Sequence, residues 1–202
     1  MRCYGDKPQS FLRLVPNGAV PAITLDGRVQ TESLDIMMLL EKEFIGPNHR
    51  RLWPDVKDHE HNRARELMRL ERDLFSRWWN LVFRPSMGGA LKTFEDGLDE
   101  VNQQLMVTGS PWFLSDLSIV DLSFIPFLER MCASAAYWSG LKIRGDGKWP
   151  AIERWFDAFE SLPSYMATKS DYYTHIKDLP PQCGRTYTIP GHEALARQID
   201  GS

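Results

Sequence analysis

Hydrophobic residues follow two different patterns along the chain, and the change falls near residue 52. Residues 20–25 and 28–31 are strand-like stretches joined by Asp26-Gly27, a pair that suits the tight turn of a β-hairpin. Apolar residues then recur at helical spacing between residues 33 and 44. A short helix over residues 7–14, a hairpin and a second helix are therefore predicted for the first part of the chain.

From about residue 56 the apolar residues recur every three or four positions over long stretches, as on the buried face of a bundle helix. The pattern predicts helices over residues 67–81, 91–105, 118–131 and 150–159. Ser118, with Asp121 three positions later, is interpreted as a capping box, a folding device without a catalytic role. We therefore expect a first domain at residues 1–52, an all-α domain at 53–165 and a polar, proline-containing C-terminal extension at 166–202.

Composition and charge narrow the functional classes. The 202 residues are 43% hydrophobic and 25% charged, and the formal net charge is −3, with Lys and Arg scattered along the sequence. This scatter argues against a nucleic-acid-binding surface. No run of about 18 apolar residues is present, so no interaction across a membrane is expected. The polar first residues lack a signal-peptide core, which favours a cytoplasmic location.

The cysteines and histidines do not indicate a metal site. Cys3, Cys132 and Cys183 are far apart and odd in number, so neither a disulfide framework nor a redox pair is expected. Cys132 falls within an apolar helix and is expected to be a small core residue. His59 and His61 are two positions apart, whereas metal ligands on a helix are spaced by about three or four.

Several motifs, in this order along the chain, resemble those of the glutathione transferases. They are residues 11–22, the Asp26-Gly27 hairpin, Thr31-Glu32-Ser33 before a helix, Ser118-Ile119-Val120-Asp121 before an apolar run, and residues 150–155. Residues 1–8 and 168–175 resemble, more narrowly, the iota class of photosynthetic organisms. The resemblance implies an α+β, mainly α fold, in which a partial thioredoxin-like domain precedes the all-α C-terminal domain of the family.

The resemblance also implies a glutathione site. In the family the peptide bond before the matching proline is cis, a form that X–Pro bonds adopt at modest cost. Carried over, the N–H and C=O of Val20, before Pro21, would pair with the cysteinyl part of glutathione like an added strand. Glu32 would supply a carboxylate near the γ-glutamyl end. Ser33 would offer its hydroxyl and the helix N–H groups to the γ-glutamyl carboxylate.

These residues also have purely structural interpretations. Pro21 is compatible with a turn at a strand start, and Ser33 with an ordinary helix N-cap. Trp78 and Trp79 lie on the helix that faces the second-substrate pocket in the family, but aromatic residues on bundle helices more often belong to the core. Adjacent helical positions point about 100° apart, so only one of the two tryptophans is expected to line a cleft.

The chain departs from the family at its catalytic group. The resemblance implies that the chain begins after the second strand of the thioredoxin-like domain, so that the first strand, helix and strand are missing. Iota-class relatives use a cysteine followed by proline, but no Cys-Pro pair occurs here and Cys3 matches a later position. No catalytic residue is therefore assigned. Because a lone hairpin is marginal in water, residues 1–45 are expected to be loosely ordered or held by the helical domain.

The leading hypothesis is a protein that takes glutathione as a substrate, without a metal, together with a small electrophilic or disulfide substrate. Conjugation or glutathione-dependent thiol reduction would follow if the missing segment were supplied. The alternatives are a non-catalytic binding or assembly module, and a carrier of hydrophobic ligands beneath Trp79. The resemblance also raises a homodimer and a plastid location. Cys183 is expected to be exposed and able to form a mixed disulfide with glutathione.

Overall fold

The structure of the protein is a computed structural model, and it describes residues 7–47, 49–84, 88–171 and 174–176. The chain divides into two compact units, Met1–Asp55 and Val56–Ser202. The fold class is the expected one, because a short thioredoxin-like region with few strands precedes an all-helical domain. Cys3, Cys183 and most of the expected C-terminal extension lie outside the described residues.

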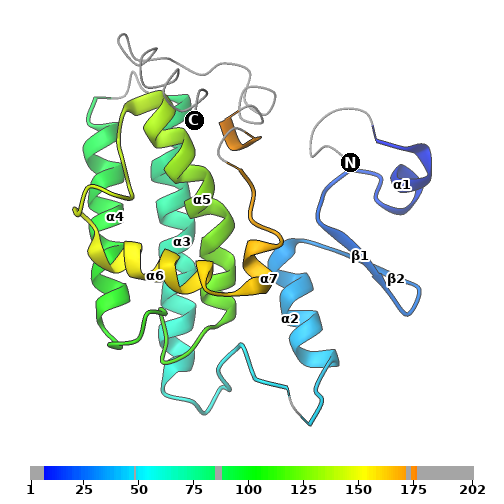
Figure 1. Cartoon of the computed structure of the whole chain (residues 1–202). Helices are drawn as coiled ribbons and strands as arrows, with labels where there is room; N and C mark the ends of the chain where they lie inside the picture. Colours follow the sequence, from blue (N-terminus) through cyan, green and yellow to red (C-terminus); the bar gives the residue numbers. More distant parts are fainter. Residues whose placement is uncertain (1–6, 48, 85–87, 172–173, 177–202) are drawn as a thin grey trace. The chain divides into compact units, whose positions relative to one another are not determined.

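The first unit is built around the predicted hairpin. Its elements are α1 at Gln9–Leu14, β1 at Ala22–Leu25, β2 at Arg28–Thr31 and α2 at Ser33–Glu43 (Figure 1). The strands pair antiparallel with Leu25 opposite Arg28, which confirms the hairpin. Asp26 and Gly27 have φ angles of 48° and 76°, the positive values that a two-residue turn of this kind requires.

The helix α2 packs against both strands of the hairpin. Ile36 on this helix is buried, and so is Val15, the residue that follows α1. Near the other end of α2, Oε1 of Glu41 accepts hydrogen bonds from the backbone N–H groups of Leu52 and Trp53, at 2.9 and 3.3 Å. A carboxylate on the helix thus holds the segment that follows it.

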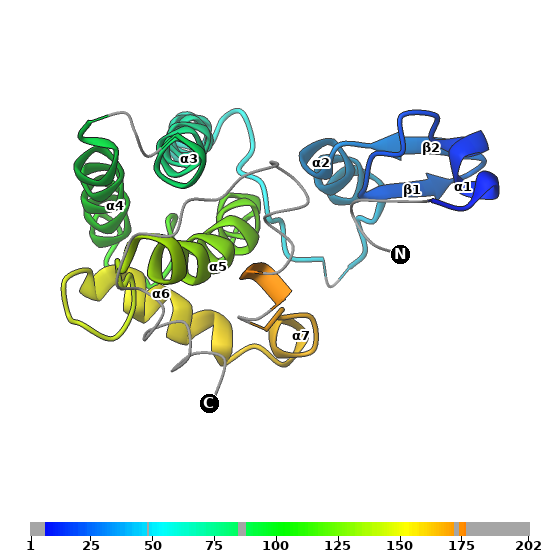
Figure 2. The same ribbon diagram turned by 90° about the horizontal axis from the view of Figure 1, so that it is seen from above.

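The second unit is a helical bundle. Its helices are α3 at Glu60–Phe83, α4 at Ala90–Met106, α5 at Ile119–Ser139, α6 at Pro150–Glu160 and the short α7 at Pro163–Met166. Helix α3 packs against α4 and α5, and α4 also packs against α6. Figure 1 shows α3, α4 and α5 side by side with α6 running across them, and Figure 2 shows the same bundle from above. The predicted helices are present, although α5 continues to Ser139 rather than ending near residue 131.

The apolar stripes of these helices meet in one core. Leu74, Leu98, Val101, Leu128 and Ile152, from four helices, are each at most 1% exposed. Full burial of such a side chain stabilises the fold by about 1.5–3 kcal/mol relative to its exposure. Within the part of the chain that the structure describes, no helix is long and apolar enough to cross a bilayer.

A buried carboxylate joins three segments of the bundle. Asp121 accepts hydrogen bonds from the backbone N–H groups of Ser118 at 2.9 Å and Phe113 at 3.1 Å, and from the indole N–H of Trp155 at 2.9 Å. Reciprocal bonds between Ser118 and Asp121 form the predicted capping box at the start of α5. Burial raises the pKa of Asp121 above its usual value, and the hydrogen bonds oppose that rise.

Candidate functional site

The residues predicted to bind glutathione lie at one end of the hairpin. They are Val20, Pro21, Glu32 and Ser33. The register pairs Ala22 of β1 with Thr31 of β2. Val20 and Pro21 directly precede Ala22, and Glu32 and Ser33 directly follow Thr31. The hairpin therefore brings two segments of the sequence together at the start of α2.

The backbone at Val20 is open. The Val20-Pro21 peptide bond is cis, as the family resemblance implied. Among the described residues, the N–H and C=O groups of Val20 have no hydrogen-bond partner. Val20 as a whole residue is 38% exposed, so this donor and acceptor lie at an accessible part of the unit. An extended peptide could pair with such a backbone edge as an additional strand does.

Glu32 has an unusual backbone conformation. Its φ is 67° and its ψ is 115°, in a region that residues other than glycine rarely adopt. Holding a glutamate there costs about 1–3 kcal/mol. Its carbonyl oxygen accepts the Ile36 N–H at 2.9 Å, so Glu32 begins the helix while its side chain stays exposed. Strain that a fold retains in this way points to a functional constraint.

Ser33 is the first residue of α2, and Glu32 occupies the N-cap position. The interpretation of Ser33 as the N-cap is therefore wrong. No side-chain hydrogen bond caps this end of the helix, so its first N–H groups remain available to an anion. Asp35, in the first turn, offsets part of this attraction because its carboxylate has the same sign as such a ligand.

The two tryptophans of α3 point in different directions. Trp78 is 1% exposed, and its indole N–H donates to Oγ of Ser134 at 2.8 Å, so it belongs to the core. Trp79 is half-buried, and its ring lies 4.4 Å from that of Phe83 between centroids. Of the two tryptophans, only Trp79 therefore has an accessible ring surface that a ligand could contact.

The described residues contain one cysteine, Cys132, and it is not an activated nucleophile. Burial raises the pKa of its thiol to about 12, so the thiol is protonated at neutral pH. No group of three or more His, Cys, Asp and Glu side chains gathers around a common point in the described residues, as a metal ion would require.

Two features of the structure were not expected from the sequence. One is the positive φ of Glu32, for which a lone sequence offers no signal. The other is Glu71, whose side chain is 1% exposed on the core-facing side of α3. A signal for Glu71 was present, because it interrupts the apolar stripe formed by Leu67 and Leu74 at helical spacing.

Comparison with protein families gives two matches that together cover most of the chain. The family described as "Glutathione S-transferase, C-terminal domain" matches residues 60–158, and "Glutathione S-transferase, N-terminal domain" matches residues 3–48. The first match covers the helices α3 to α5 and most of α6. The second contains the hairpin and the whole of α2.

Similar proteins include two from Arabidopsis thaliana. Glutathione S-transferase L1 is 28% identical over 159 residues, which are 77% of this chain and 62% of that protein. The chloroplastic Glutathione S-transferase L2 is 29% identical over 154 residues, 75% of this chain and 49% of that protein. This chain thus spans less than two thirds of the length of either relative.

Solved structures share the fold. The trimeric glutathione transferase TDR1 of Leishmania superposes with a TM-score of 0.71 at 20% identity. The match covers 85% of this chain and 38% of that one. At 20% identity this similarity shows a shared fold and does not show a shared activity.

Proposed function

We propose that this chain is a member of the glutathione S-transferase family, distantly homologous to its plant lambda class, and that it binds glutathione at the open end of its hairpin. The backbone of Val20 pairs with the cysteinyl part of the tripeptide. Ser33 and the first N–H groups of α2 receive the γ-glutamyl carboxylate, and the Glu32 carboxylate receives the γ-glutamyl ammonium group.

The observation that carries this proposal is that the open backbone of Val20 lies at the same end of the hairpin as the strained start of α2. The N–H and C=O of Val20 have no hydrogen-bond partner among the described residues, and they lie directly before the β1–β2 pair. The strain at Glu32 begins a helix that no side chain caps. Glutathione carries a peptide backbone, a carboxylate and an ammonium group, and the four residues offer a complement to each.

The reaction that would follow is glutathione conjugation to a small electrophile, or reduction of a disulfide through a glutathionyl mixed disulfide. Both use the glutathione sulfur, and in both the tripeptide backbone must be held while the sulfur remains accessible. Trp79 is the proposed contact for the second substrate, because its ring is half-buried rather than enclosed. We assign no catalytic residue on this chain.

Finer features of the assignment are also proposals. The iota-class resemblance rests on residues 1–8 and 168–175, which the structure describes only in part. A homodimer is proposed because relatives in this family commonly form one. A cytoplasmic or plastid location is supported by relatives such as the chloroplastic transferase L2.

Titration calorimetry with reduced glutathione tests the binding proposal. Replacing Ser33→Ala or Glu32→Ala removes a partner of a charged group, so each affinity should fall about tenfold or more. The matched controls are Ser76→Ala on α3 and Glu43→Ala at the end of α2, both exposed, which should leave affinity unchanged. Equal affinity in all variants would contradict the proposed site.

The non-catalytic alternative gives a different result in the same experiment. Suppose that the unaltered chain shows no heat of binding at millimolar glutathione, and that in a pull-down it retains one protein partner in stoichiometric amount. The assembly-module hypothesis then replaces the transferase one. Turnover of a generic electrophile by this chain would show that a catalytic group is present after all.

A further inference from the structure

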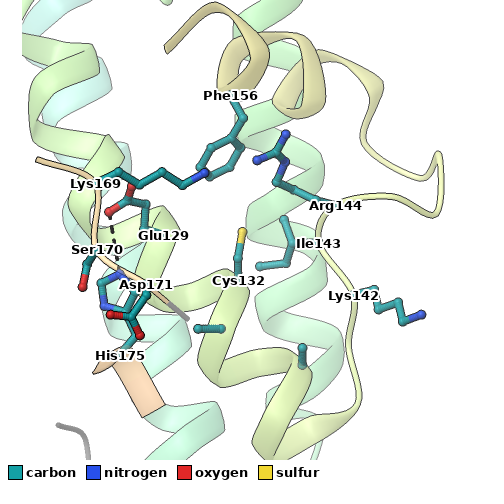
Figure 3. A pocket seen from close by; sticks show the side chains of 12 residues that line it. Glu129, Cys132, Lys142, Ile143, Arg144, Phe156, Lys169, Ser170, Asp171 and His175 are labelled. Atoms are coloured by element: carbon teal, nitrogen blue, oxygen red, sulfur yellow. Dashed lines mark ion pairs between the residues drawn. The ribbon is translucent and has the colours of Figure 1, made fainter. Parts of the chain in front are cut away.

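A cavity separate from the proposed glutathione site lies wholly within the helical unit. It has a volume of about 430 Å³ and is walled by α5, by Phe156 of α6, by residues 142–144 and 169–171, and by His175 (Figure 3). This size falls in the range of small-molecule sites, about 300–1,000 Å³. Neither Trp78 nor Trp79 lines it, so it is distinct from the proposed second-substrate surface.

The apolar part of the cavity has a simple origin. Cys132, Ala133 and Ala136 put only small side chains on the α5 wall, and the opposite walls carry Phe156 and Ile143. Protein interiors are normally packed as densely as organic crystals, so small residues facing a large ring leave a space that a ligand can fill. In Figure 3 the Cys132 thiol and the Phe156 ring both point into this space.

The polar end of the cavity is incompletely bonded. Nε2 of His175 lies 3.6 Å from Oε2 of Glu129, too far for a hydrogen bond, and Nε2 is buried without another partner in the described structure. The other carboxylate oxygen of Glu129 accepts a hydrogen bond from the Tyr165 hydroxyl. A buried polar atom without a partner calls for an explanation, and a ligand hydroxyl supplies one. It would accept from Nε2–H of His175 and donate to Oε2 of Glu129.

The charges around the cavity favour an uncharged ligand. Arg144 donates hydrogen bonds to Glu153 at 2.9 Å and to Glu160 at 2.8 Å, and Lys169 also donates to Glu160. Arg144 and Lys169 are therefore already neutralised by carboxylates of α6, and the cavity is also lined by Lys142 and Asp171, which carry opposite charges. The Glu129 carboxylate at the polar end would repel an anion. Cys132 stays a protonated thiol, because burial raises its pKa to about 12, and so acts as an apolar wall.

We propose that this cavity binds a small neutral phenol, with its ring between Phe156 and the α5 wall and its hydroxyl bridging His175 and Glu129. The ring supplies apolar area to a space lined by small and aromatic side chains. The hydroxyl is both donor and acceptor, and this end of the cavity presents one group of each kind.

The test uses the full chain and two matched probes, p-cresol and 4-methylanisole. The probes have similar apolar bodies, but the ether oxygen of 4-methylanisole cannot donate a hydrogen bond. Ligand-observed NMR titration should give p-cresol an affinity about tenfold higher than that of 4-methylanisole. In His175→Leu this preference should disappear, because the acceptor–donor pair is broken.

A cavity-filling variant provides the second arm. Ala136→Phe places a ring in the cavity and should abolish binding of both probes, whereas Ala167→Phe, at an exposed position outside the cavity, should leave binding unchanged. Circular dichroism establishes that each variant is folded. The proposal is overturned if folded Ala136→Phe still binds p-cresol, if the two probes bind equally, or if p-cresol shows no binding at millimolar concentration. Glutathione titration is a separate measurement, so failure of one proposal leaves the other standing.

Discussion

On the core-facing side of α3, Glu71 occupies a position where the helical pattern calls for an apolar residue. Nε of Arg72 lies 2.9 Å from one carboxylate oxygen, yet within the described structure neither oxygen of Glu71 accepts a well-aligned hydrogen bond. Burial raises the pKa of Glu71 to about 6, and the charge of Arg72 only partly opposes the rise. The folded protein therefore binds a proton at Glu71 more tightly than the unfolded chain does.

This raised pKa predicts a pH dependence of stability. The proton-linked stabilisation is fully present below about pH 4.5 and is lost as pH rises through about 6, because the carboxylate must then be buried in its charged form. Glu71→Gln removes that cost. Its free energy of unfolding at pH 7.5 should exceed that of the unaltered protein by about 2 kcal/mol, and the difference should vanish near pH 4.5.

Urea unfolding at a series of pH values between these limits measures the effect. Glu66→Gln is the matched control, because Glu66 is exposed on the same helix and its replacement should not alter the pH profile. A difference between Glu71→Gln and the unaltered protein that is constant with pH would contradict the assignment.

At the scale of the elements, Asp121 links the start of α5 to the preceding loop and to α6. Its three donors are Ser118, Phe113 and Trp155, and all of these bonds are buried. The sequence predicted only the local part of this arrangement, since a capping box is defined by residues three positions apart. The bonds from Phe113 and Trp155 depend on how distant segments pack, and no spacing rule reports them.

Removing the Asp121 carboxylate should therefore cost more than removing an ordinary cap. Asp121→Ala leaves three buried N–H donors without their acceptor, and the free energy of unfolding should fall by about 3–5 kcal/mol. Ser118→Ala, which leaves the carboxylate in place, should lower it by about 1 kcal/mol. Thermal or urea unfolding gives both values. A loss in Asp121→Ala no larger than in Ser118→Ala would mean that the Phe113 and Trp155 bonds contribute little.

At the scale of the whole molecule, sequence patterns among neighbouring residues predicted the helices and the hairpin correctly. Features that depend on packing between distant segments were not predicted. Asp26-Gly27 specified the hairpin, and the apolar spacing specified the helices of the bundle. The burial of Glu71 and the cavity beside Cys132 arise from packing between segments far apart in sequence, and the positive φ of Glu32 has no signal in a lone sequence. The cis bond before Pro21 was predicted through family resemblance, because X–Pro bonds in general are mostly trans.

The two-unit organisation predicts where a protease cuts. Phe44 and Ile45 are 58% and 67% exposed in the segment between α2 and α3. Brief treatment with chymotrypsin should therefore cleave after Phe44 and leave a fragment that retains the helical signal in circular dichroism, because the core of the bundle lies entirely within the second unit. Mass spectrometry identifies the cut, and Phe44→Ala should slow it. Uniform resistance along the chain, or loss of the bundle at the same rate, would contradict this view of the units.

The hydrogen bond from Trp155 to Asp121 also bears on how the chain folds during its synthesis. Trp155 follows Asp121 by 34 residues, so it leaves the ribosome later. Until it arrives, the carboxylate remains hydrated and the nascent α5 lacks its tie to α6. Translation therefore delivers this donor only after the whole of α5 has been made, and the link between α5 and α6 through Asp121 forms late.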